Sequence, residues 1–241
     1  MTDGSVFDLP VLAASRWMFT CYAILGDDGS VVMVDAGLPS SAQGALNSLR
    51  GAGRQPEDVT AVLATHGHSD HVGGMSTVLD QTAARALLPE RCRHYLEGET
   101  PRNFGVDANV RFLPMMGQHP FKPAALRELA QVGRTDGYGR RPTFALPFIP
   151  SGYLADGDPV PGGPGWTVIA TPGHTDDSIS LYHADSATLM SGDEVLTHDG
   201  RAWFNPEWVD RRAHSATEER LRALDVRYLL PGHGRPVEGD V

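Results

Sequence analysis

Cysteine, lysine and long hydrophobic runs are all scarce in this chain of 241 residues. The two cysteines, Cys21 and Cys92, belong to no CxxC or Cys/His pattern, which argues against a disulfide framework and a cysteine-based metal site. No stretch approaches the roughly 20 consecutive apolar residues that span a bilayer. The N-terminus lacks the basic start and apolar run of a signal peptide. We therefore expect a cytoplasmic protein without a membrane segment.

Positive charge is also scarce, because the formal net charge is −10 at pH 7 and Lys122 is the single lysine. A negative chain repels phosphate backbones, so nucleic acid is disfavoured as a partner and a small-molecule substrate is favoured. The segment from Arg85 to Arg141 is an exception, with ten Lys and Arg against six Asp and Glu. It carries +4 and leaves −14 on the rest, so a phosphate or carboxylate could still be bound there.

The hydrophobic content of 41% is that of an ordinary globular protein, and we expect one domain over residues 1–241. Apolar runs predict strands over Val31–Val34 and Val59–Thr65. A helix is predicted from about Gly74 to Leu88. Alternating strands and helices indicate an α/β fold.

Proline interrupts the pattern between about residues 89 and 150, where one clear helix is predicted over Pro123–Val132. Strands resume at Trp166–Thr171, and a capping box at Ser215 predicts the start of a late helix. We interpret residues 89–150 as an insertion in the domain, a cap of helices and loops.

The most informative motif is the run His66-Gly67-His68-Ser69-Asp70-His71, which directly follows a predicted strand. Neutral imidazole and carboxylate are good Zn²⁺ ligands. The pair His66 and His68 can point at one ion from an extended strand end. Asp70 and His71 can face a second ion where the chain turns into a helix.

Three single residues extend this motif: His174, Asp193 and His233. Each lies at the C-terminal end of a predicted apolar strand, where α/β folds place their sites. Alone, each of them is weak evidence for a metal ligand, because a lone His is more often structural and Asp after Gly is usually part of a turn. Together with the cluster they complete seven ligands for two metal ions.

On these motifs the sequence resembles the metallo-β-lactamase-fold hydrolase superfamily. The resemblance implies an αββα sandwich, in which two mixed sheets lie between helices with the metals at one edge. It assigns the ligands to two ions as follows: His66, His68 and His174 to the first, Asp70, His71 and His233 to the second, and Asp193 bridging both.

The resemblance also implies the chemistry. Two divalent cations, Zn²⁺ in the first place with Mn²⁺ or Fe as alternatives, hold a bridging hydroxide that attacks a polarised carbonyl or phosphoryl centre. Asp70 and His233 are assigned catalytic roles in addition to metal binding. Asp35 matches a residue that orients a ligand histidine and does not bind metal itself.

Members of the superfamily act on different substrates, and the sequence disfavours some of these activities. The bridging Asp193 argues against β-lactamases, and the 40 residues from Asp193 to His233 do not accommodate the helical domain of glyoxalase II. Leu196 stands where well-known lactonases have Tyr. We expect hydrolysis of an ester, lactone or thioester of a small apolar or acyl substrate. A phosphodiesterase or ribonuclease is the main alternative, because Asp176-Asp177 follows His174, with a β-lactamase or a persulfide dioxygenase behind it.

Aromatic and Met side chains are the candidates for a substrate pocket under the cap, although they would equally suit a small core within it. The substrate candidates are Trp17, Phe19, Met116, Tyr138 and Trp203. Whether the insertion is a cap or an interface, including that of a homodimer, stays open at this point. A non-catalytic sensor with the same fold is disfavoured by the complete ligand set.

Overall fold

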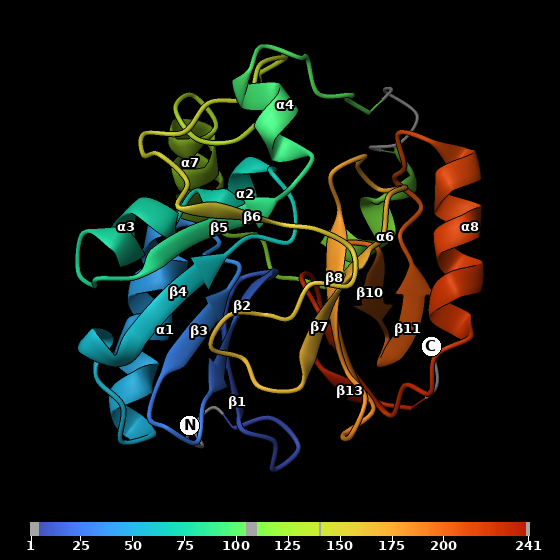
Figure 1. Cartoon of the computed structure of the whole chain (residues 1–241). Coiled ribbons are helices and arrows are strands. Elements are labelled where there is room, and N and C mark those ends of the chain that lie inside the picture. The colour runs from blue at the N-terminus through green and yellow to red at the C-terminus, as the bar shows by residue number, and fades with distance from the viewer. Residues whose placement is uncertain (1–4, 105–109, 140, 240–241) are drawn as a thin grey trace.

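The protein is described by a computed structural model over residues 5–104, 110–139 and 141–239. Two β-sheets face each other, and helices cover their outer sides (Figure 1). Helices α1 (Pro39–Gly51) and α3 (Met75–Leu79) flank the first sheet, while α8 (Arg211–Arg222) flanks the second. The predicted αββα sandwich of the α/β class is thereby confirmed.

The first sheet has six strands in sequence order. They are β1 (Val11–Arg16), β2 (Phe19–Leu25), β3 (Val31–Val34), β4 (Val59–Leu63), β5 (Arg85–Pro89) and β6 (Gly152–Leu154). Pairing is antiparallel from β1 to β3 and parallel from β3 to β6. A 3-10 turn, η1 (Pro56–Asp58), precedes β4. The carboxyl ends of β3 and β4 therefore meet at one edge, which brings Asp35 close to the loop that begins at Thr65.

The second sheet has five strands, in the order β13, β12, β9, β8 and β7. Their bounds are β7 (Trp166–Ala170), β8 (Ile179–His183), β9 (Thr188–Gly192), β12 (Tyr228–Pro231) and β13 (Val237–Glu238). A separate hairpin pairs β10 (Val195–His198) with β11 (Arg201–Phe204). Because β9 and β12 are parallel, Asp193 and His233 leave the sheet at the same edge.

The core consists of apolar layers on both faces of each sheet. The sequence of strand β3 is uniformly apolar because both of its faces are buried. Val32 and Val34 point between the two sheets, whereas Val31 and Met33 point toward the layer beneath α1. Leu221 of α8 packs on the outer face of the second sheet. Burial on both faces fixes the sheets against each other and holds their shared edge rigid.

Residues 90–151, which connect β5 to β6 and correspond to the predicted insertion, are hereafter called the cap segment. It contains α4 (Cys92–Leu96), α6 (Leu113–Gly117) and α7 (Pro123–Val132), and α7 has the bounds that the sequence predicts. Ala125 and Val132 of α7 pack against Met18, Phe19 and Leu38. Leu126 and Leu129 of α7 line the same cavity as Asp193 and His233, so this part of the cap segment lies beside the edge where those two residues emerge. Figure 1 shows α7 and α4 beyond the ends of strands β4 and β5.

Two predicted boundaries are wrong. The helix expected to reach Leu88 ends at Leu79, and residues 85–89 form the buried strand β5. Periodicity cannot separate a short, fully buried strand from a helix. The late helix begins at Arg211, where Asp210 accepts hydrogen bonds from two backbone N–H groups, so Ser215 lies inside it. Over the described residues, no helix is both long and apolar enough to cross a membrane.

Candidate metal centre

The HxHxDH run occupies the turn from β4 into the short helix α2 (Ser69–Val72). His66 and His68 precede the helix, and His68 has an extended backbone, whereas Asp70 and His71 belong to the helix. A Cβ on Gly67 would lie 2.8 Å from the rings of both Tyr138 and Phe144. Only glycine therefore allows the cap segment to pack this closely on the loop.

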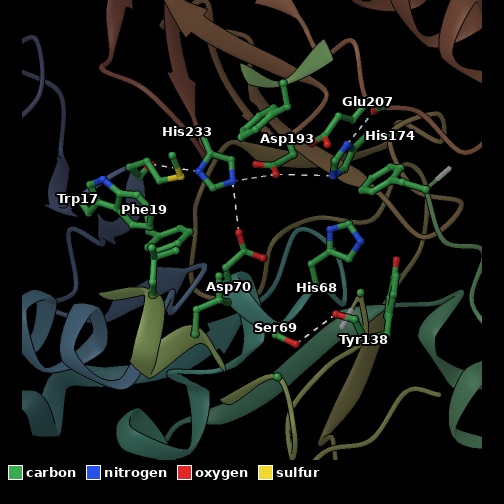
Figure 2. Close-up of a pocket in the computed structure, with 17 residues that line it drawn as sticks. Trp17, Phe19, His68, Ser69, Asp70, Tyr138, His174, Asp193, Glu207 and His233 are labelled. Atoms are coloured by element: carbon green, nitrogen blue, oxygen red, sulfur yellow. Dashed lines mark hydrogen bonds and ion pairs between the residues drawn. The ribbon is translucent and has the colours of Figure 1, made fainter. Parts of the chain in front are cut away.

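The structure brings all seven candidate ligands together. Their ligand atoms form three groups, within each of which every atom lies within 4.8 Å of the others: His66, His68 and His174; Asp70, His71 and His233; and His66, His71 and Asp193. Figure 2 shows Asp193 between His233 and His174, with Asp70 and His68 on the facing side. The first two groups are those that the resemblance assigns to two ions.

Asp193 occupies the centre of the cluster. One carboxylate oxygen, Oδ2, lies 3.0 Å from Nε2 of His233 and 3.6 Å from Nε2 of His174. The other, Oδ1, lies 3.3 Å from Nε2 of His71. Neighbouring ligands of a tetrahedral zinc ion are about 3.4 Å apart. The spacing around Asp193 is thus that of side chains converging on cations.

Three buried atoms of the cluster have no hydrogen-bond partner among the described residues: Nε2 of His71, Nε2 of His174 and Oδ1 of Asp193. Buried polar atoms without a partner are costly and rare in native proteins. Each of these atoms can bind a metal ion through a free lone pair. The residues present therefore fit a metal centre on geometry and on unsatisfied donor atoms.

Backbone carbonyls and a carboxylate hold the opposite ring nitrogens. Nδ1 of His174 lies 2.9 Å from the Glu207 carbonyl, and Nδ1 of His233 lies 3.1 Å from the Met18 carbonyl. Nδ1 of His71 lies 3.0 Å from Oδ2 of Asp35. An N–H donated from each Nδ1 leaves the lone pair on Nε2, which faces the cluster.

Asp35 is held in an unusual backbone conformation, with φ of 54°. Its Oδ1 accepts the Thr65 backbone N–H at 2.7 Å, while its Oδ2 faces His71. Asp tolerates this left-handed region better than most residues do. The contacts place Asp35 behind a candidate ligand, at the start of the HxHxDH loop.

The two halves of the cluster differ in protonation in the metal-free protein. Burial lowers the pKa of His68 and of His174 to about 4, and lowers that of His66 as well. Burial also opposes charge on His233, but Asp193 and Asp70 outweigh it and raise the pKa of His233 to about 10. The same balance, with Asp193 and Asp35, raises the pKa of His71. Protons thus occupy the acidic half, where cations would compensate the same carboxylates.

A cavity of about 340 Å³ opens beside the cluster, a size that suits a small molecule. Its apolar wall consists of Trp17, Met18, Phe19, Phe104, Phe112, Leu126, Leu129 and Tyr138. Three of the substrate candidates therefore line the cavity: Trp17, Phe19 and Tyr138. Trp203 does not: it lies against His198 on the β10–β11 hairpin, with ring centroids 5.4 Å apart. The side chain of Met116 lies outside the described residues.

No Lys or Arg is found among the described residues that line this cavity. Arginines of the cap segment instead contact the second half of the chain. Arg91 pairs with Asp176, Arg102 pairs with Asp210, and Arg111 stacks on Trp208. These three arginines therefore hold the cap segment against the second half of the chain and do not line the cavity.

Sequence reasoning missed two residues in the loop after β11. Asn205 is fully buried and donates its side-chain N–H to the Asp193 carbonyl at 2.8 Å. Glu207 lines the cavity, and burial followed by the charge of Asp193 raises its pKa to about 7. No spacing or periodicity in the sequence marks either residue, because the contacts arise from a loop folding back onto β9.

The family model of the metallo-beta-lactamase superfamily matches residues 17–233, and the chain belongs to this superfamily. A probable metallo-hydrolase of Bacillus subtilis, YflN, is 27% identical over 233 residues, which cover 87% of this chain and 77% of that protein. An archaeal superfamily protein from Sulfolobus tokodaii has a TM-score of 0.62 at 16% identity, covering 95% of this chain and 82% of that one.

A metallo-β-lactamase from Novosphingobium pentaromativorans, MIM-1, also matches in structure. It has a TM-score of 0.60 at 22% identity and covers 93% of this chain and 74% of that one. These structural likenesses show the shared fold. With the His/Asp cluster, superfamily membership establishes the protein as a metallo-hydrolase of this class.

Proposed function

We propose that the protein hydrolyses an ester, lactone or thioester bond in a small apolar acyl substrate and uses two divalent metal ions, zinc in the first place. His66, His68 and His174 would hold one ion, and Asp70, His71 and His233 the other. Asp193, whose two oxygens face both groups, would bridge them.

One observation carries the choice of substrate: beside the cluster the cavity wall is mostly apolar, with Glu207 as its one further charged residue, and it carries no described Lys or Arg. Phe104 and Phe112 come from the cap segment, and their rings lie close to candidate ligands. The Phe104 centroid is 4.9 Å from that of His174, and the Phe112 centroid is 6.0 Å from that of His233. An acyl chain fits such a wall, whereas a phosphodiester would meet no Lys or Arg of the described residues there.

Divalent metal ions at these positions would lower the pKa of water and polarise a carbonyl oxygen. The protein positions the other participants. Asp70 lines the cavity, and its Oδ2 lies 3.4 Å from Nε2 of His233. Asp70 can therefore accept the proton of an attacking water, while His233 fixes the orientation of its carboxylate. The aromatic wall excludes bulk water and orients the acyl group toward the cluster.

The residues that favoured a nuclease have other contacts. Asp176 accepts hydrogen bonds from Arg91 and Tyr95. Asp177 accepts hydrogen bonds from the Gly67 backbone N–H and from the Tyr138 hydroxyl. Both aspartates thus tie the cap segment or the HxHxDH loop in place, which supports an acyl substrate over a phosphodiester.

The test is a substrate panel assayed with metal-quantified protein. A thioester, a lactone, an aryl ester, a β-lactam and bis-(nitrophenyl) phosphate are compared by kcat/KM. We expect the highest value for one of the first three. A phosphodiester or β-lactam preferred by more than about tenfold, a difference of about 1.4 kcal/mol in transition-state binding, would overturn the proposal.

A matched pair of cap variants tests the apolar wall. Phe112→Ala removes a ring beside His233 and should lower kcat/KM for an octanoyl ester relative to an acetyl ester. Phe121→Ala serves as the control, because this phenylalanine of the same segment is 74% exposed. Equal selectivity in both variants would show that the cap segment does not bind the acyl chain.

A further inference from the structure

Glu207 occupies a position in the cavity that the metal centre does not explain. It lies between β11 and α8, and only 8% of its surface is exposed. Its backbone N–H donates to Oδ1 of Asn205 at 2.9 Å, and its carbonyl accepts from Nδ1 of His174. The backbone on both sides of this carboxylate is therefore fixed relative to a candidate metal ligand.

The carboxylate itself has no hydrogen-bond donor within the ranges 5–104, 110–139 and 141–239. The positive side chains whose charge reaches it are those of His233, a candidate metal ligand, and Arg111, which stacks on the Trp208 ring at 4.4 Å. A carboxylate that is largely buried loses part of its hydration, and no described residue donates a hydrogen bond in its place. Such a group at a cavity wall is accounted for if a bound molecule supplies the donor.

The location of Glu207 specifies where that donor must be. Glu207 lines the same cavity as Asp70, His174 and Asp193, and Figure 2 shows it on the side of Asp193 and His174. Apart from the metal-ligand cluster, it is the one charged side chain among the described residues lining the cavity. A group held by Glu207 would thus be a near neighbour of a carbonyl placed at the cluster, while the remainder of the substrate contacts the apolar wall.

We propose that Glu207 is a specificity-determining residue that accepts a hydrogen bond from an ammonium group on the carbon next to the scissile carbonyl. The inference rests on the proposed acyl hydrolysis and narrows its substrates to amino-acyl esters or thioesters with an apolar side chain. An ammonium gains more than a hydroxyl at this position, because its hydrogen bond to a carboxylate is charge-assisted on both sides.

The experiment compares three S-ethyl thioesters that differ in one group: 2-amino-, 2-hydroxy- and 2-methyl-3-phenylpropanoate. The ratio of kcat/KM between the amino and methyl compounds is measured in the wild type and in Glu207→Gln. The double ratio cancels the intrinsic reactivity of each thioester. We expect the amino-to-methyl ratio to fall at least about tenfold in Glu207→Gln, and the hydroxy-to-methyl ratio to fall less.

Glu219→Gln is the matched control, because Glu219 is exposed on α8 and is not among the described residues that line the cavity. Its amino-to-methyl ratio should equal that of the wild type. An unchanged amino-to-methyl ratio in Glu207→Gln would overturn the inference. An equal fall in the amino-to-methyl and hydroxy-to-methyl ratios would overturn it too, because it would indicate a general distortion of the cavity.

A binding measurement separates this inference from the proposed function. Calorimetry compares 2-phenylethylamine with 2-phenylethanol on metal-loaded wild type and Glu207→Gln. Tighter binding of the amine that is lost in the variant supports the inference even if no thioester is hydrolysed, a result that would overturn only the proposed acyl hydrolysis. Equal binding of the amine to both proteins would contradict the role of Glu207.

Discussion

The Asp35 carboxylate lies 3.0 Å from Nδ1 of His71 and also accepts the Thr65 backbone N–H at 2.7 Å. One buried side chain thus links the end of β4 to a candidate ligand on α2. This arrangement fixes the ring orientation of His71 before any metal binds.

Replacing Asp35 should weaken metal binding with little loss of fold. In Asp35→Asn the amide keeps one acceptor for Thr65 but no longer balances the charge at His71, so we expect metal affinity to fall roughly 10- to 100-fold. Competition with a chromophoric chelator measures the change. Asp185→Asn, at an exposed loop position, is the control. Wild-type affinity in Asp35→Asn would rule out this role.

Gly232 should be irreplaceable for a different reason. A Cβ at this position would lie 2.4 Å from Oδ1 of Asp193, so Gly232→Ala must displace the central carboxylate. We expect metal affinity to fall about tenfold or more. Gly44→Ala is the matched substitution, because a Cβ there meets open space on the exposed side of α1 and should stabilise the fold by about 1 kcal/mol. Full metal content in purified Gly232→Ala would contradict the geometry.

Metal uptake at pH 7 should release protons. In the metal-free protein, carboxylates raise the pKa of His233 to about 10 and also raise that of His71, so both rings are protonated at neutral pH. A raised folded-state pKa stabilises the metal-free protein fully below about pH 6.5, and this contribution is lost as the pH rises toward 10. Calorimetry in two buffers of different ionisation enthalpy measures the released protons. Uptake without proton release would contradict the assigned charges.

The Tyr138 hydroxyl should matter for stability, because it is donated to the buried carboxylate of Asp177 and not to the cavity. Tyr138→Phe leaves that carboxylate with one donor fewer and should lower the free energy of unfolding by about 1–3 kcal/mol. Denaturant unfolding measures this change in the free energy of unfolding. Tyr153→Phe, which removes a hydroxyl without a hydrogen bond to the described chain, should change stability much less. Equal effects would show that the Asp177 contact contributes nothing specific.

Residue type and spacing were enough to predict an α/β fold and to select seven side chains that the structure brings together. The reason is physical: His174, Asp193 and His233 follow short apolar runs, and parallel strands place their carboxyl ends at one edge. The αββα arrangement followed from the family resemblance that those motifs carry. The strand at residues 85–89 was missed because a short buried run has no period of its own.

Contacts made by loops could not be predicted in the same way. Glu207 and Asn205 reach His174 and Asp193 only because the chain after β11 folds back, and nothing local in the sequence encodes that path. The position of Trp203 depended on which way the β10–β11 hairpin faces, and it lies beside His198, away from the cavity lining.

The most direct test of the central claim is a metal titration of the metal-free protein, followed by thioester or ester hydrolysis at each step. The account predicts that activity rises with bound divalent metal and reaches its plateau at two equivalents per chain, and that Asp193→Ala and His174→Ala lose activity by orders of magnitude. Full activity without metal, or in both variants while they remain folded, would contradict it.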